Sequence, residues 1–286
     1  MPPINILSLG AGVQSSALAL MAARGDFQDL NGQVQKLDAA IFADTQSEPK
    51  KVMEWLDYLE SEIGKQPHGF PLYRVTNGSL AAGETTLKRS KKTGLLYPAN
   101  RIPAFVLKPD GTKGLLGRKC TSDFKIVPIQ RKVKEICGVK RASQKLLARM
   151  WIGISMDESH RMKPSRVPYI ENTWPLIDAG MTREDCLKWM ADHGYPEPPR
   201  SACTFCPFHS DEEWQMLKSE SPDEFKKVVE FERAIQLAVS KQETLKGVPF
   251  LHVSCQPIDT VDFSPKRGGY EQISLFGNEC TGLCGV

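Results

Sequence analysis

The stretch Ile4-Asn-Ile-Leu-Ser-Leu-Gly-Ala-Gly-Val-Gln-Ser-Ser-Ala-Leu-Ala-Leu-Met-Ala-Ala23 decides the expected fold. It begins as a short apolar strand, continues through a turn of small residues at 8–16, and ends in residues of high helix propensity. Ala39–Ala43 is the next apolar run, and a second helix follows it, with Val52, Trp55, Leu56 and Leu59 at helical spacing. This alternation predicts an α/β protein with a doubly wound, mainly parallel sheet covered on both faces.

Later segments repeat the alternation. Met150–Ile154 is strand-like, Trp174–Ile177 is expected to be another short strand, and Thr182 opens a helix through about His193. Residues 76–119 are rich in Gly, Lys and Thr and predict an insertion or mobile loop. We therefore expect a nucleotide-binding domain at 1–200 and a helical, cysteine-containing extension at 201–286 packed on it. In that extension, Ser210 and Ser221 each begin a capping box.

Composition favours an ordinary globular protein. The chain has 286 residues, of which 41% are hydrophobic and 25% are charged. No apolar run approaches the roughly 20 residues that cross a bilayer, and the first residues make a poor signal peptide. We expect a cytoplasmic protein without membrane contact, in which most of the 8 cysteines are reduced, metal-bound or catalytic.

The net charge of +3 hides an uneven distribution. Residues 88–141 hold 15 Lys/Arg against 3 Asp/Glu, while the rest of the chain holds 22 against 31. A charge block of this size predicts a site for an anion, either a nucleotide or a nucleic acid, with a solvated basic loop as the alternative.

The turn after the first strand has the composition of a phosphate-binding loop. Gly10 and Gly12 let the backbone approach a phosphate, free N–H groups at the helix start hold it, and Ser15 and Ser16 add hydroxyl donors. It is neither a Walker A loop nor a G-x-G-x-x-G loop. A tight turn that merely needs small residues is the other interpretation.

Five segments in order resemble the PP-loop ATP pyrophosphatases, in the phosphoadenylylsulfate (PAPS) reductase-like branch of the adenine nucleotide α-hydrolase-like superfamily. They are distributed in order between residue 4 and about residue 210, a span that takes in most of the chain: Gly10–Ser15, Phe42–Pro49, Cys120–Ile129, Gly153–Arg161 and Pro175–Cys206. Where the Ser-Gly-Gly-x-Asp-Ser loop has Ser, Gly and Asp, this chain has Gly10, Ala11 and Gln14.

The resemblance implies ATP or a related adenine nucleotide, with Mg²⁺, as ligand. It places the nucleotide against residues of the phosphate loop and of the loops that follow the strands: Ser8, Gly10, Gly12, Gln14, Ser15, Ser16, Asp44, Lys125 and Arg161. Asp157 and Glu158 are candidate catalytic residues, because strand C-termini are where ligands bind in such sheets. An ordinary loop salt bridge is the alternative for this cluster.

The cysteines offer a second kind of site. Cys203 and Cys206 have the C-x-x-C spacing of a metal or cluster site, and equally of a redox dithiol. By resemblance Cys120 is a third ligand, for a [4Fe–4S] cluster or alternatively Zn²⁺. The fourth position is expected to be Cys280 or Cys284 of the tail, or to stay open for a sulfur atom. Cys280 and Cys284 are also candidate nucleophiles, since they loosely resemble the Glu-Cys-Gly-Leu/Ile-His tail of PAPS reductases. Cys137, Cys186 and Cys255 are expected to be structural.

Three functions follow from these expectations. The first is adenylation of a substrate with pyrophosphate release for sulfur transfer, with a sulfur donor protein and DNA or tRNA, bound through residues 88–141, as partners. The second is a sulfonucleotide reductase. The third is a nucleotide- or nucleic-acid-binding module without catalysis.

Overall fold

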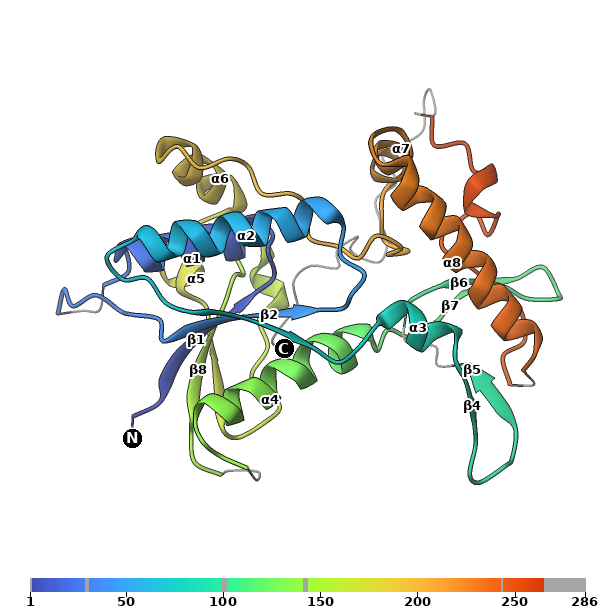
Figure 1. The fold of residues 1–286 in the computed structure, drawn as a ribbon, viewed down its shortest axis with the longest axis horizontal. Helices are drawn as coiled ribbons and strands as arrows, with labels where there is room; N and C mark the ends of the chain where they lie inside the picture. The colour runs from blue at the N-terminus through green and yellow to red at the C-terminus, as the bar shows by residue number, and fades with distance from the viewer. Residues whose placement is uncertain (1, 29–30, 99–101, 141–143, 243, 265–286) are drawn as a thin grey trace. The chain divides into compact units, whose positions relative to one another are not determined.

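The computed structural model describes residues 2–28, 31–98, 102–140, 144–242 and 244–264 (Figure 1). The chain divides into two compact units. The first unit runs up to Asn77 and resumes over Thr121–Ser201, and the second joins Gly78–Cys120 to the described residues 202–264. The segment expected as an insertion therefore groups with the C-terminal part of the chain.

The first unit is built on a five-stranded, all-parallel sheet with the order β3-β2-β1-β8-β9. Its strands are β1 (Ile4–Leu9), β2 (Ala39–Asp44), β3 (Leu72–Thr76), β8 (Ala148–Ile152) and β9 (Ile170–Thr173). Its helices are α1 (Val13–Arg24), α2 (Lys50–Lys65), the π-helix η1 (Thr121–Ile126), α4 (Val127–Ile136), the 3-10 helix η2 (Met156–Arg161), α5 (Pro175–Asp178) and α6 (Arg183–Asp192). The parallel sheet predicted from the sequence is confirmed.

Helices cover both faces of this sheet, and alternate strand residues explain why. In β1, Leu7 packs with α1, α2 and α6 in one core cluster, whereas Ile6 packs with Ile129 and Val133 of α4 in the other. Successive side chains of a strand point to opposite faces, so a strand between two helical layers is mainly apolar on both faces. Figure 1 shows α1 and α2 on one side of the sheet and α4 on the other.

The order of the strands creates a switch point between β1 and β8. From β1 the chain proceeds outward through β2 to β3, and it later returns on the opposite side of β1 as β8 and β9. In open α/β sheets, ligands bind at such a switch point, outside the carboxyl ends of the strands. The residues that follow these two strands are Gly10–Gly12 and Gly153–Ser155.

Three local predictions were wrong. Trp174–Ile177 is not a strand: Pro175 opens the short helix α5, where proline at the first position costs no hydrogen bond. The prediction of a mobile loop at 76–119 was wrong, because this segment holds one helix and four short strands. The segment does interrupt the first unit, as the expected insertion would. Ser221 forms no capping box, since its side chain makes no capping hydrogen bond, although Pro222 does start α8.

In its described residues, the second unit combines a small antiparallel sheet, a separate hairpin, three α-helices and one short 3-10 helix. Its elements are α3 (Leu80–Thr85), β4 (Leu87–Arg89), β5 (Leu96–Pro98), β6 (Phe105–Leu107), β7 (Lys113–Leu115), α7 (Asp211–Glu220), α8 (Pro222–Ser240), β10 (Val248–Phe250) and η3 (Ile258–Thr260). The sheet has the order β10-β6-β7, and α8 packs against β10 and α3. The carboxylate of Glu232 in α8 is buried and accepts the backbone N–H groups of Leu251 (2.9 Å) and Ile258 (2.7 Å).

Among the described residues, no helix is both long enough and apolar enough to span a bilayer.

Candidate functional site

The loop between β1 and α1 holds itself in one conformation. Ala11 is fully buried and adopts a left-handed backbone conformation (φ 60°), which is rare outside glycine and costs energy. The Ser15 hydroxyl accepts the N–H of Gly10 and donates to the carbonyl of Gly12, both at 3.2 Å. Ser201 also donates to the carbonyl of Gly10. These bonds fix the position of the loop before any ligand arrives.

The first turn of α1 presents its backbone N–H groups without a side-chain cap. Gly12 is the N-cap residue, and it provides no side-chain capping hydrogen bond to these N–H groups. The hydroxyl of Ser8, at the end of β1, is also buried without a hydrogen-bond partner among the described residues. Uncapped N–H groups at the positive end of a 12-residue helix suit an anion.

The two serine hydroxyls expected to bind phosphate already have protein partners. Ser15 braces the loop, and the hydroxyl of Ser16, which is fully buried, accepts the indole N–H of Trp55 at 2.9 Å. Backbone N–H groups therefore remain as the principal phosphate donors of this loop.

The end of β8 packs directly against this helix start. A Cβ atom at Gly153 would lie 2.8 Å from both the Cα and the backbone nitrogen of Ser15. Next to it, the side-chain amide of Gln14 donates to the hydroxyl of Ser155, at 3.4 Å, and Ser155 in turn bonds to Asp157. The phosphate loop and the candidate carboxylate are thus joined through one buried serine.

Asp157 is held as an anion at the start of α6. Its carboxylate accepts the backbone N–H of Arg183 at 3.0 Å. Burial raises the pKa of Asp157, but the hydrogen bonds from Ser155 and from the Arg183 N–H outweigh it and hold the pKa below its ordinary value. This carboxylate organises the loop after β8.

Glu158 and Arg161 form a compact ion pair within η2. Their side-chain atoms Oε2 and Nη1 are 2.5 Å apart, and the two side chains are only 12% and 10% exposed. Such a pair is strong in a low-dielectric setting, so an anion bound by Arg161 would share the guanidinium with Glu158.

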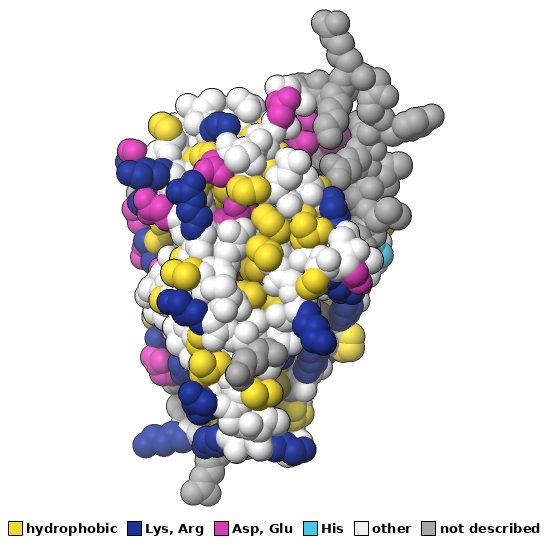
Figure 2. Space-filling view, turned by 90° about the vertical axis from the view of Figure 1, so that its right-hand side faces the viewer, with side chains coloured by type: hydrophobic (Ala, Val, Ile, Leu, Met, Phe, Trp, Pro, Cys, Tyr) yellow, Lys and Arg dark blue, Asp and Glu magenta, His cyan; other side chains and the backbone are white. Residues whose placement is uncertain are grey.

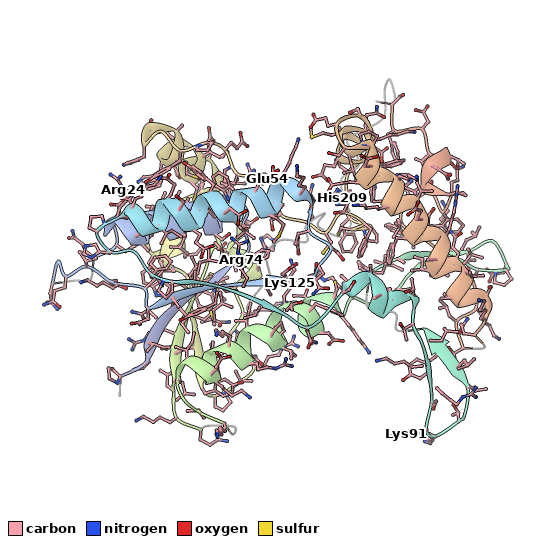
Figure 3. All side chains as sticks on the ribbon, in the orientation of Figure 1. Arg24, Glu54, Arg74, Lys91, Lys125 and His209 are labelled. Atoms are coloured by element: carbon pink, nitrogen blue, oxygen red, sulfur yellow. The ribbon has the colours of Figure 1, made fainter. Side chains whose placement is uncertain are left out.

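Asp44 and Lys125 lie near the end of β2. The Asp44 carboxylate accepts the N–H of Gln46 at 2.6 Å, and Gln46 has a left-handed backbone (φ 55°). Lys125 is buried in η1, which packs against β2 (Figure 3). Pro128 explains the wide turns of η1, because a proline has no N–H to donate and clashes with the preceding turn of a regular α-helix.

Cys203 and Cys206 occupy one tight turn of the second unit. The N–H of Cys206 bonds to the carbonyl of Cys203 at 2.9 Å, and the N–H of His209 continues the turn by bonding to Cys206 at 3.2 Å. The ring nitrogen Nε2 of His209 lies 3.0 Å from the Cys203 carbonyl, and the ring itself packs on Trp214 with centroids 4.7 Å apart. The sequence interpretation missed His209, although Cys-x-x-Cys-x-x-His was visible as a spacing.

The described residues do not complete the expected metal centre. They contain no group of three or more His, Cys, Asp or Glu side chains placed to hold one ion, so Cys120, Cys203 and Cys206 do not form such a group there. Cys280 and Cys284 lie outside the described residues. We derive no chemical step through a metal, and the metal centre stays a prediction.

The three remaining cysteines have structural surroundings. Cys186 is buried in α6, and burial raises the pKa of its thiol to about 12, with the nearby Asp157 and Asp185 adding to the effect. Cys255 is buried and Cys137 half-buried, and burial raises the pKa of both thiols as well. All three are therefore poor nucleophiles near neutral pH.

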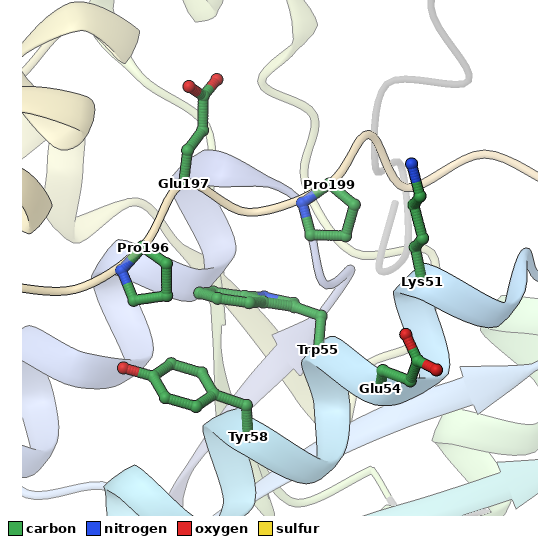
Figure 4. A pocket seen from close by; sticks show the side chains of 7 residues that line it. All are labelled: Lys51, Glu54, Trp55, Tyr58, Pro196, Glu197 and Pro199. Atoms are coloured by element: carbon green, nitrogen blue, oxygen red, sulfur yellow. The ribbon is translucent and has the colours of Figure 1, made fainter. Parts of the chain in front are cut away.

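A cleft of about 450 Å³ lies on α2 (Figure 4). Its walls are Trp55 and Tyr58, with ring centroids 5.0 Å apart, and Pro196 and Pro199, and it is edged by Lys51, Glu54 and Glu197. Trp55 connects it to the phosphate-loop helix through Ser16. The sequence interpretation used Trp55 only as a helix-face residue.

No protein-family model matches this chain, and no curated protein matches it either.

Proposed function

We propose that the first unit binds the phosphates of an adenine nucleotide at the start of α1. The observation that carries the proposal is the uncapped N-terminus of α1, located at the switch point of a parallel sheet beside the buried Ser8 hydroxyl. The adenine specificity rests on the resemblance of the loop and of the segments after β2 and β8 to PP-loop enzymes.

The reaction we propose is adenylation. A substrate oxygen attacks the α-phosphorus of ATP, the bond to pyrophosphate breaks, and a sulfur nucleophile then displaces AMP from the activated substrate. The loop N–H groups would hold the departing pyrophosphate, and Lys125 and Arg161 would balance its charge. Mg²⁺, when bound, would supply further charge neutralisation for the phosphates.

The cysteines would serve the sulfur chemistry. Cys203 and Cys206, and in the C-terminal residues Cys280 and Cys284, are the thiols that we assign to sulfur carriage or to a cluster with Cys120. A cytoplasmic, reducing setting would keep these thiols available.

A substitution at Gly12 tests the phosphate site. A Cβ atom there would meet only the Ser201 Cβ, at 3.8 Å, and φ is an ordinary −93°, so a side chain is compatible with folding. We expect Gly12→Asp to abolish ATP binding, because a carboxylate would occupy and repel the phosphate position. Gly12→Asn has the same size without the charge and should weaken binding less.

Binding is measured by calorimetric titration of ATP, with matched urea midpoints as the control for folding. If both variants bind ATP like the wild type, the phosphate site is not at α1.

Product analysis separates the three functions. Magnesium-dependent pyrophosphate release from ATP supports adenylation, and sulfite release from a sulfonucleotide supports the reductase. Tight ATP binding with neither product supports a non-catalytic module, for which the neutral Gln14 in place of an Asp is the favouring observation.

A further inference from the structure

The second unit carries a basic hairpin, residues 86–98, that the nucleotide site does not use. Strands β4 and β5 pair antiparallel, with Lys88 opposite Tyr97 and Arg89 opposite Leu96. The connecting loop is closed by bonds from the Ser90 N–H to Leu95 and from the Gly94 N–H to Ser90, each 2.9 Å. Gly94 has a left-handed backbone (φ 73°), so the loop is an ordered turn.

Positive charge on this hairpin is not neutralised by the protein. Lys88, Arg89, Lys91 and Lys92 are all exposed, and no Asp or Glu occurs between Glu84 and Asp110. Among the described residues of 78–120, no Lys or Arg takes part in an ion pair. Lys and Arg side chains gather at the lower end of the face in Figure 2, and Figure 3 shows Lys91 at the tip of the hairpin.

The cations are distributed around the hairpin instead of along one side. Cross-strand partners share a face and successive residues alternate, so Lys88 projects from the face of Tyr97 and Arg89 from the face of Leu96. Lys91 and Lys92 project from the turn. One N–H of Arg89 bonds to the Gly94 carbonyl at 2.6 Å, and the guanidinium has other donors for an external acceptor.

This arrangement distinguishes between anionic partners. A membrane surface or an acidic protein patch presents charge on one side and would leave half of these cations in water. A nucleic-acid groove presents phosphates on both sides of an inserted element, and the major groove of B-form DNA is wide enough for a two-stranded ribbon.

We propose that the basic hairpin binds duplex DNA by entering the major groove, with its four cations on the flanking phosphates. This names a partner for the proposed nucleotide-dependent chemistry, but the contact does not depend on the nucleotide site.

The test is anisotropy of a labelled DNA duplex over a range of salt concentrations with the full-length protein. Each phosphate contact contributes about −0.9 to the slope of log K against log salt. Replacing Lys88, Arg89, Lys91 and Lys92 with Gln should therefore flatten the slope by up to about 3.6. The control has the same change of charge in the same unit, at exposed lysines outside the hairpin: Lys226→Gln, Lys227→Gln, Lys241→Gln and Lys246→Gln.

Each outcome of this experiment either supports or overturns the proposal that the hairpin binds DNA. A flattened slope in the hairpin variant alone supports the proposal, and an equal loss in both variants, or in neither, overturns it. Tighter binding of an RNA duplex of the same sequence would also overturn it, because the A-form major groove is too narrow for the ribbon. ATP titration of the same variants keeps the two proposals separate, since the hairpin variant should bind ATP like the wild type.

Discussion

Gly153 gives the sharpest test of how the proposed nucleotide site is built, because it lies where β8 meets the start of α1. A methyl group there would come within 2.8 Å of the Ser15 Cα and backbone nitrogen and 3.1 Å of the Gln14 carbonyl carbon. All three are backbone atoms, which cannot rotate away as the end of a flexible side chain can. We therefore expect Gly153→Ala to push the first turn of α1 away from the sheet.

The size of the effect follows from the surroundings of α1. Ten of its twelve residues are buried, so the helix has no open side toward which to shift. Overpacking of this kind typically costs about 1–3 kcal/mol. With a urea m-value of about 3 kcal/mol/M, the unfolding midpoint should fall by about 0.3–1 M. ATP affinity should fall as well, because the displaced N–H groups belong to the proposed phosphate site.

Gly64→Ala is the matched control, with the opposite expected sign. Gly64 lies in α2, and a methyl group there would meet nothing within 4 Å. Replacing a helical glycine in open space should stabilise the protein by about 0.5–1 kcal/mol. The reasoning fails if Gly153→Ala unfolds at the wild-type urea concentration and binds ATP normally.

Two further outcomes are expected elsewhere in the chain. Burial raises the pKa of Glu232 above the ordinary carboxyl range, although the N–H groups of Leu251 and Ile258 act against it. As pH rises, the unfolded chain therefore loses the Glu232 proton before the folded protein does. The contribution of Glu232 to the free energy of unfolding should fall above about pH 4.3, the ordinary pKa of a glutamate. Glu232→Gln should remove this part of the pH dependence of the urea midpoint. Cys203→Ser should lower the iron or zinc content of anaerobically purified protein while Cys137→Ser leaves it unchanged, and a metal-free wild type would leave Cys203 and Cys206 as a redox pair.

The parallel sheet was predictable because its strands carry an unambiguous signal. β2 is a continuous apolar run up to Asp44, β1 and β8 are mainly apolar, and α2 has apolar residues at helical spacing. A strand buried on both faces admits few polar residues, so the sequence pattern and the structural position correspond closely.

The same reasoning failed for short segments, and the reasons are physical. A four-residue apolar run such as Trp174–Ile177 has no measurable period, and Pro175 at its start was the better signal, for a helix. Strands β4 to β7 have three residues each, so their pairing depends on partners and turns more than on their own composition. The division into two units joins segments that are distant in sequence, which no local pattern records.

At the site, the loop was visible in the sequence but the way it is held was not. The left-handed position is occupied by Ala11, where composition pointed to the glycines on either side. Whether Ser16 would face a ligand or Trp55 depended on the position of α2, which only the fold supplies.

Gln14 and Asp157 belong to one hydrogen-bond network, which runs through Ser155. The hydroxyl of Ser155 accepts from the amide of Gln14 and has a single hydrogen to donate, which goes to Asp157. A carboxylate at position 14 would compete for that hydrogen and add a second negative charge beside Asp157. A neutral donor at position 14 avoids both costs. The negative charge of this network therefore sits after β8, on the carboxylate that also accepts the first N–H of α6.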